Sequence, residues 1–121
     1  VYSDGTPTRT FCYISDAITG YLLALTSDEH FNYFNIGIDS PEISIRELAD
    51  IFIRQGQAIT RYTGSAQFQP PPEKDYLTHN PSRRCPDIRK ARTVLGYSPE
   101  VFIHEGVGRM ITFFRENKGS L

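Results

Sequence analysis

The chain has 121 residues, the length of one ordinary domain, and its 13 Lys and Arg nearly balance its 14 Asp and Glu, giving a formal net charge of −1. This balance disfavours general nucleic-acid binding, because such proteins carry an excess of basic side chains. No apolar run approaches the roughly 20 residues that cross a bilayer, and the first residues do not resemble a secretory signal. We therefore expect one soluble, cytoplasmic domain over residues 1–121, without membrane association.

The N-terminal quarter predicts a strand followed by a helix. An Asp4-Gly5 turn precedes an alternating run over residues 11–14, which favours a strand. Ser15 or Asp16 is then placed to cap a helix. Apolar residues at helical spacing predict the buried stripe of this helix: Ala17, Ile18, Tyr21, Leu22 and Leu25.

A second strand and a strongly marked helix are expected next. Residues 31–38, FNYFNIGI, form an aromatic and β-branched run that predicts a strand covered on both faces. Ser44 and Glu47 have the spacing of a capping box, in which each side chain accepts from the other residue's amide. The helix that they start is expected to end near Gly56, with its buried stripe at Ile45, Leu48, Ala49, Phe52 and Ile53.

The remaining chain predicts a strand over residues 58–64, a long proline-rich loop over 66–86 and two further helices. Asp87 is expected to cap a helix that runs to Leu95 and stops at Gly96. After a short strand, a last helix is predicted from about His104 to Asn117, with its inner stripe at Val107, Met110, Ile111 and Phe114. The order of elements is typical of an α/β or α+β protein.

Few residues indicate catalysis or metal binding. The chain has no glycine-rich phosphate loop and no Tyr-x-x-x-Lys pair. Cys12 and Cys85 lack C-x-x-C spacing, and the three histidines share no metal-ligand spacing with them, so free thiols and no metal site are expected. Asp28 and Glu29 are best interpreted as a solvated turn.

Anion binding has more support. Arg9 heads the first predicted strand, and Arg83 and Arg84 precede the Asp87 helix, so forked guanidinium groups from distant segments could meet on one phosphate. The alternative is that these arginines are exposed or paired with Glu73, Asp75 and Asp87. The residues alone leave both interpretations open, and the surface role is the commoner one for arginine.

Three blocks carry a family resemblance: DGTPTRTFCYISDAITGYLLAL, YFNIGIDSPEISIRELADIF and NPSRRCPDIRKARTVLGYSPEVFIHEGVGRMITFF. In this order and spacing they resemble the C-terminal portion of NAD-dependent nucleotide-sugar epimerases and dehydratases, the extended short-chain dehydrogenase/reductases. The UDP-glucuronate decarboxylase and dTDP-glucose 4,6-dehydratase branch is the most similar. The resemblance implies an α/β fold with small mixed sheet pieces and about four helices, lacking the Rossmann cofactor half.

The resemblance also implies site residues. The family's two diphosphate-binding arginines correspond to Arg9 and Arg84, and its pocket-lining strand to Phe11 and Tyr13. Tyr2 occupies a position on the nucleotide side. The other basic residues of the 83–92 stretch correspond to no such role and are expected on a solvated helix face: Arg83, Arg89, Lys90 and Arg92. Pro86 and Asp87 are expected to be structural, and Asn35 and Gly37 match a strand near the nicotinamide end.

The family's NAD loop and catalytic Tyr-Lys pair precede the region that resembles this chain. We therefore expect a fragment that is inactive by itself, with no catalytic residue and no cofactor of its own, NAD belonging to the intact parent. Its implied ligand is a UDP- or dTDP-sugar. Residues 31–38 are expected to present an unpaired edge that favours a homodimer. The alternative is a non-enzymatic binding module derived from the family. A small RNA-binding domain is disfavoured by the charge balance.

Overall fold

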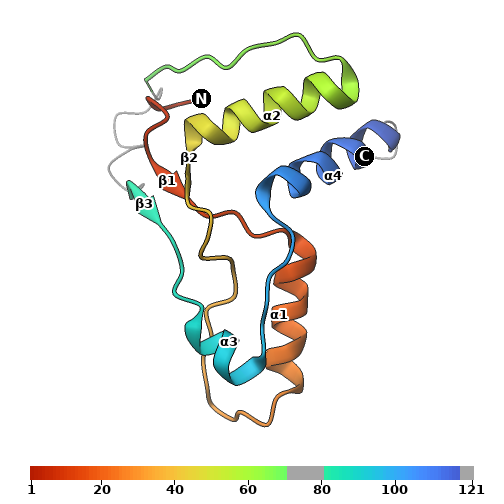
Figure 1. Ribbon diagram of the computed structural model, residues 1–121. Helices are drawn as coiled ribbons and strands as arrows, with labels where there is room; N and C mark the ends of the chain where they lie inside the picture. Colours follow the sequence, from red (N-terminus) through yellow and green to blue (C-terminus); the bar gives the residue numbers. More distant parts are fainter. Residues whose placement is uncertain (71–80, 118–121) are drawn as a thin grey trace. The chain divides into compact units, whose positions relative to one another are not determined.

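The computed structural model describes residues 1–70 and 81–117 (Figure 1). Its elements are four helices and three short strands, and the strands form one sheet in the order β2-β1-β3. The expected α/β class with about four helices is confirmed. The chain divides into two compact units, which we describe separately: residues 1–9, 43–83 and 104–121, and residues 10–42 and 84–103.

In the first unit, β1 (Thr8–Arg9) pairs antiparallel with β2 (Ile43–Ser44), with Thr8 opposite Ser44. The Thr8 amide also donates to the Ser82 carbonyl at 2.8 Å, next to β3 (Arg83–Arg84). The strands are only two residues long, so the sheet supplies little of the packing. For the site, the sheet matters because it holds Ile43–Ser44 and Ser82 beside β1, the strand that carries Arg9.

The capping box predicted for the second helix is present. In α2 (Ile45–Thr60) the Ser44 hydroxyl accepts from the Glu47 amide at 3.1 Å, and a Glu47 carboxylate oxygen accepts from the Ser44 amide at 2.8 Å. The hydrogen bond from Ser44 holds the pKa of the Glu47 carboxyl below its ordinary value. This local motif therefore fixes the start of α2, as the sequence predicts.

The end of α2 differs from the prediction. The helix continues past Gly56 to Thr60, so the strand predicted over residues 58–64 is wrong. Arg61 takes a left-handed conformation (φ 60°), and the amides of Arg61 and Tyr62 donate to the carbonyls of Gln57 and Gly56. Gly56 is needed for close approach instead, because a Cβ there would lie 3.3 Å from that of Tyr62.

The last helix, α4, spans Ile103–Glu116, close to its predicted bounds. Val107 is buried as expected, whereas Met110 and Phe114 are 36% and 50% exposed. From His104 onward α4 belongs to the first unit, where the Arg115 guanidinium donates to the Ile59 carbonyl of α2. The two helices enclose part of an apolar cavity of about 530 Å³, lined mainly by α2 side chains and by Ile111.

The second unit has its core around α3 (Arg89–Leu95), which packs against α1 (Ile14–Thr26) (Figure 1). Four buried residues form this core: Ile88, Ala91, Leu95 and Tyr97. Leu23 and Ala24 of α1 pack against it, together with Phe34 and Ile36. As predicted, α3 ends at Gly96 in the left-handed conformation (φ 67°), whereas no strand forms over the described residues 96–103.

The expected orientation of α1 is wrong. Residues 11–14 form no strand, the helix begins at Ile14, and neither Ser15 nor Asp16 caps it. Asp16 is instead buried, and its carboxylate accepts from the amides of Glu100 (3.0 Å) and Val101 (2.8 Å). Most of the predicted inner stripe is exposed, by 48–80%, at Ile18, Tyr21, Leu22 and Leu25.

Residues 31–38 also depart from the prediction, because they form no strand. Phe31 has a positive φ of 56° and is fully exposed, which breaks the extended run at its first residue. Phe34 and Ile36 do pack on the core, and Ile38 is buried. The segment is thus anchored by alternate side chains on one face only, and the apolar edge expected for dimerisation is reduced to Phe31 and Tyr33.

Candidate functional site

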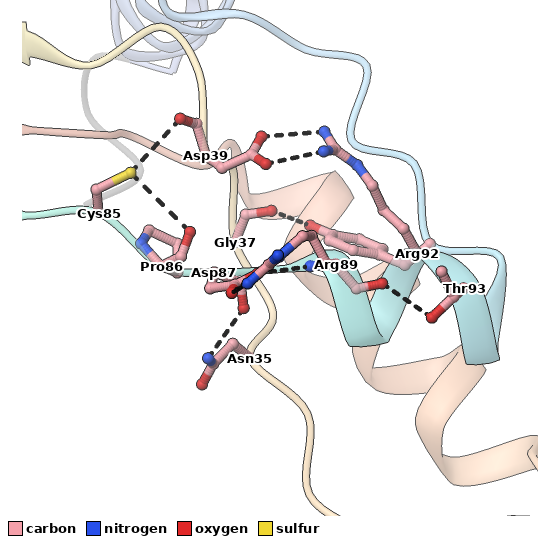
Figure 2. A network of polar contacts seen from close by, with 10 residues as sticks. Asn35, Gly37, Asp39, Cys85, Pro86, Asp87, Arg89, Arg92 and Thr93 are labelled. Atoms are coloured by element: carbon pink, nitrogen blue, oxygen red, sulfur yellow. Dashed lines mark hydrogen bonds and ion pairs between the residues drawn. The ribbon is translucent and has the colours of Figure 1, made fainter.

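Most basic side chains between Arg83 and Arg92 are already paired, and Figure 2 shows the pairs of Arg89 and Arg92. Arg92 donates two hydrogen bonds to the Asp39 carboxylate, at 2.8 and 3.0 Å, and Arg89 forms an ion pair with Asp87. Lys90 donates to Asn32 and lies 4.1 Å from the centre of the Tyr33 ring. Hydrogen bonding from Arg89 lowers the pKa of Asp87 to about 2. These side chains support the loop and helix, as expected for a solvated face.

Arg84 differs from these neighbours. Its side chain is exposed and makes no hydrogen bond or ion pair in the part of the chain that the structure describes, whereas Arg83 is engaged. The backbone of Arg84 is nevertheless held, since its carbonyl accepts from the Thr10 amide at 3.3 Å. A free guanidinium on a fixed backbone is suited to an anionic ligand, because a planar fork can bind two phosphate oxygens.

The segment that follows Arg84 runs alongside residues 35–39 (Figure 2). The side-chain amide of Asn35 donates to the backbone carbonyl of Asp87 at 3.0 Å, and the Cys85 thiol donates to the backbone carbonyl of Asp39 at 3.5 Å. Between these contacts, Gly37 faces Pro86 so closely that a Cβ on Gly37 would lie 3.1 Å from the proline Cγ. The segment after Arg84 is therefore held by two hydrogen bonds, and between them it lies close against Gly37.

Arg9 is placed differently. It is half-buried, and its guanidinium donates to the carbonyls of Thr8 and Pro81, both at 2.6 Å. Arg9 belongs to the first unit and Arg84 to the second. Their joint contact with one diphosphate stays a prediction.

The three aromatic candidate residues also belong to different units of the chain. Tyr2 lies in the first unit and is half exposed. Phe11 and Tyr13 lie in the second unit, where both are half-buried and Tyr13 is the N-cap residue of α1. Phe11 directly follows Thr10, whose amide contacts the Arg84 carbonyl, so the segment bearing Phe11 lies beside Arg84. The pocket-lining role of Phe11 stays a prediction.

Sequence reasoning did not identify Asp39, and it assigned Asn35 and Gly37 to a strand rather than to the support of Arg84. A signal was present, because residues 35, 37 and 39 alternate and side chains two apart share one side of an extended segment. Within the described ranges, no cluster of His, Cys, Asp and Glu could hold a metal ion, and both cysteines are free thiols. No described helix is long and apolar enough to span a bilayer.

Comparison with known proteins shows the family to which this chain belongs. Residues 1–37 match the model of the NAD dependent epimerase/dehydratase family. UDP-glucuronic acid decarboxylase 1 of Arabidopsis thaliana is 35% identical over 95% of this chain, and the corresponding enzyme of Xenopus tropicalis is 36% identical over 96%. The chain belongs to this family of NAD-dependent nucleotide-sugar epimerases and decarboxylases.

Solved structures agree. The UDP-glucuronic acid 4-epimerase of Bacillus cereus, in complex with UDP-glucuronic acid and NAD, matches 96% of this chain with a TM-score of 0.72 and 29% identity. An epimerase from Methanothermobacter thermautotrophicus matches 97% with a TM-score of 0.80 and 26% identity. The chain spans about a quarter of the Arabidopsis enzyme (24%) and about a third (34%) of the Bacillus chain.

Proposed function

We propose that this chain forms the nucleotide-sugar-binding portion of an NAD-dependent epimerase or decarboxylase, with Arg84 as a direct ligand of the diphosphate. The observation that carries the proposal is that the Arg84 guanidinium has no partner within residues 1–70 and 81–117, whereas its basic neighbours are already engaged. Bound by Arg84, and by Arg9 after exchange of its carbonyl contacts, the diphosphate would hold the sugar in a fixed place. Tyr2, Phe11 and Tyr13 would contribute apolar and aromatic surface to the same ligand.

The chemical step falls outside these residues. The sequence has neither a glycine-rich loop for the NAD pyrophosphate nor a Tyr-x-x-x-Lys pair for proton transfer. NAD, when bound by an intact enzyme of this family, would supply oxidation of the sugar. This chain would bind and orient the substrate, and it would be inactive by itself. The alternative, a non-enzymatic binding module, shares the ligand but predicts no turnover even when the chain is joined to a cofactor-binding portion.

Titration of UDP into the isotope-labelled chain, followed by NMR, tests the binding site. We expect shift changes at the Arg84 and Cys85 amides, and loss of about 1.5–3 kcal/mol of binding free energy in Arg84→Ala, the range for a hydrogen bond to a charged group. The matched control is Arg89→Ala, which removes a basic side chain already paired with Asp87. Equal losses in the two variants would mean that the basic cluster acts only through its overall charge.

We also propose self-association through the exposed face of α1 rather than through residues 31–38. Ile14, Ile18, Tyr21, Leu22 and Leu25 lie on one side of the helix and are 48–80% exposed. A contiguous apolar surface of this kind favours pairing with a second copy of the chain. Light scattering should show a dimer that Leu22→Glu converts to a monomer. Val94→Glu, which replaces the exposed large apolar side chain of α3, should leave the dimer intact. A monomeric parent chain would contradict this proposal.

A further inference from the structure

The contacts around residues 84–87 point to more than a loop held in place. Three residues at alternate positions, Asn35, Gly37 and Asp39, meet three successive residues after Arg84 in reverse order (Figure 2). Asn35 contacts Asp87, Gly37 faces Pro86, and the Asp39 carbonyl accepts from Cys85. Both segments belong to the same unit. We call residues 35–39 the support segment.

The support segment is itself fixed from its other side. The buried Tyr97 hydroxyl donates to the Gly37 carbonyl at 2.9 Å, and burial raises the pKa of this phenol, so it stays a neutral donor. Arg92 binds the Asp39 carboxylate through two hydrogen bonds, and Asp39 is only partly exposed (27% of its side chain). Tyr97 in the core and Arg92 on α3 thus fix the support segment. The support segment in turn fixes the backbone that follows Arg84.

We propose that Asn35, Gly37 and Asp39 are positioning residues, which fix the backbone of Arg84 so that its guanidinium is presented to the diphosphate without a partner of its own. This inference rests on the proposed function of Arg84. It accounts for a fixed Arg84 backbone beside a side chain that makes no contact with the described residues. A ligand that meets a fixed backbone has less conformational entropy to remove on binding than one that must order a loop.

Glycine is required at position 37 for its size. Its conformation is ordinary, but a Cβ 3.1 Å from the Pro86 Cγ would force the proline to shift by a few tenths of an ångström, and the proline ring cannot turn away. Gly37→Ala should therefore displace the 84–87 segment while leaving Arg84 chemically intact. Asn35→Ala removes the contact to Asp87 without adding bulk, and Asp39→Asn weakens the pairing with Arg92.

The test uses the full 121-residue chain and two readouts. The first is NMR relaxation of the Arg84 and Cys85 amides without ligand, which should show increased motion in Gly37→Ala and Asn35→Ala. The second is the affinity for UDP, which should fall by about three- to tenfold in each variant, less than the loss from removing Arg84 itself, because the guanidinium remains. Thr93→Ala is the control, since it removes a hydrogen bond to the Arg89 carbonyl in the same unit but leaves the support segment untouched. Asp39→Glu, which keeps a carboxylate, should recover more affinity than Asp39→Asn.

A double substitution separates positioning from a general structural effect. If Asn35 acts through Arg84, then Asn35→Ala should cause no further loss of UDP affinity in the Arg84→Ala background. Equal losses in both backgrounds, or unchanged relaxation at Arg84 in both Gly37→Ala and Asn35→Ala, would overturn the inference and leave the proposed function intact. An Arg84→Ala variant that binds UDP as well as the parent would overturn the proposed function and this inference together.

Discussion

Replacing Gly20 with alanine tests the packing of α1 on the core, because two opposite effects compete there. Alanine favours a helix over glycine by about 1 kcal/mol. A Cβ at position 20, however, would lie 3.0 Å from Tyr97 Cε2 and 3.1 Å from Ile36 Cδ1, and nearer still to Ile36 Cγ2. Tyr97 is 1% exposed and cannot move without breaking its hydrogen bond to Gly37. Overpacking costs about 1–3 kcal/mol, so we expect a net loss of about 1 kcal/mol in stability.

Chemical denaturation followed by circular dichroism measures this difference, with Gly108→Ala as the matched control. Gly108 lies inside α4, and a Cβ there would meet the end of the flexible Gln55 side chain at 3.3 Å and Ile59 Cδ1 at an ordinary contact distance of 4.0 Å. The helix-propensity gain should then remain, and Gly108→Ala should be neutral or stabilising by up to about 1 kcal/mol. If Gly20→Ala stabilises the chain as much as Gly108→Ala does, α1 does not pack on Ile36 and Tyr97 in this way.

Three further outcomes are expected. Asp16→Ala should lower the free energy of unfolding by about 2–4 kcal/mol, because the backbone amides of Glu100 and Val101 lose a charged acceptor. Asp16→Asn should lower it less, and chemical denaturation measures both changes. In an NMR titration, the Asp87 carboxyl should show a pKa of about 2 in the folded chain. Its contribution to stability is then fully present above the unfolded pKa near 3.8 and is lost as the pH falls through about 2. Arg89→Ala should return the pKa of Asp87 toward its ordinary value. Calorimetry with NAD should show no sub-micromolar binding to the chain, and such binding would refute our interpretation of the missing phosphate loop.

Local signals predicted the fold where short stretches of sequence decide the structure. The capping box at Ser44 and Glu47 needs only residues three apart, and Gly96 stops α3 by its own left-handed conformation. The end of α2 has no such signal, because a non-glycine residue, Arg61, takes the left-handed conformation that ends the helix. The sequence therefore predicted the helix ends that a capping box or a glycine marks, and it missed the end of α2.

In the candidate site, too, local sequence predicts some features, and long-range contacts determine others. The resemblance singled out Arg84, but the sequence alone could not separate it from its neighbours, because the partner of Arg92 lies 53 residues away at Asp39. Once such long-range pairs are known, Arg84 stands out as the basic residue of this stretch without a partner among the described residues. Identification of Arg84 as available for a ligand thus required the tertiary contacts of the other basic residues.

The orientation of α1 could not be predicted, because the helix is apolar on more than one face. The stripe with most of the large side chains, at Ile18, Leu22 and Leu25, is exposed, while the opposite side, with Gly20, Leu23 and Ala24, packs on the core. Helical periodicity selects the stripe with the greatest apolar content, but close packing against Tyr97 and Ile36 requires small residues. A helix that is apolar all round is characteristic of one that is covered on both sides. The exposed stripe of α1 is the surface of the self-association proposed above, and Leu22→Glu tests that proposal without touching the side of the helix that packs on the core.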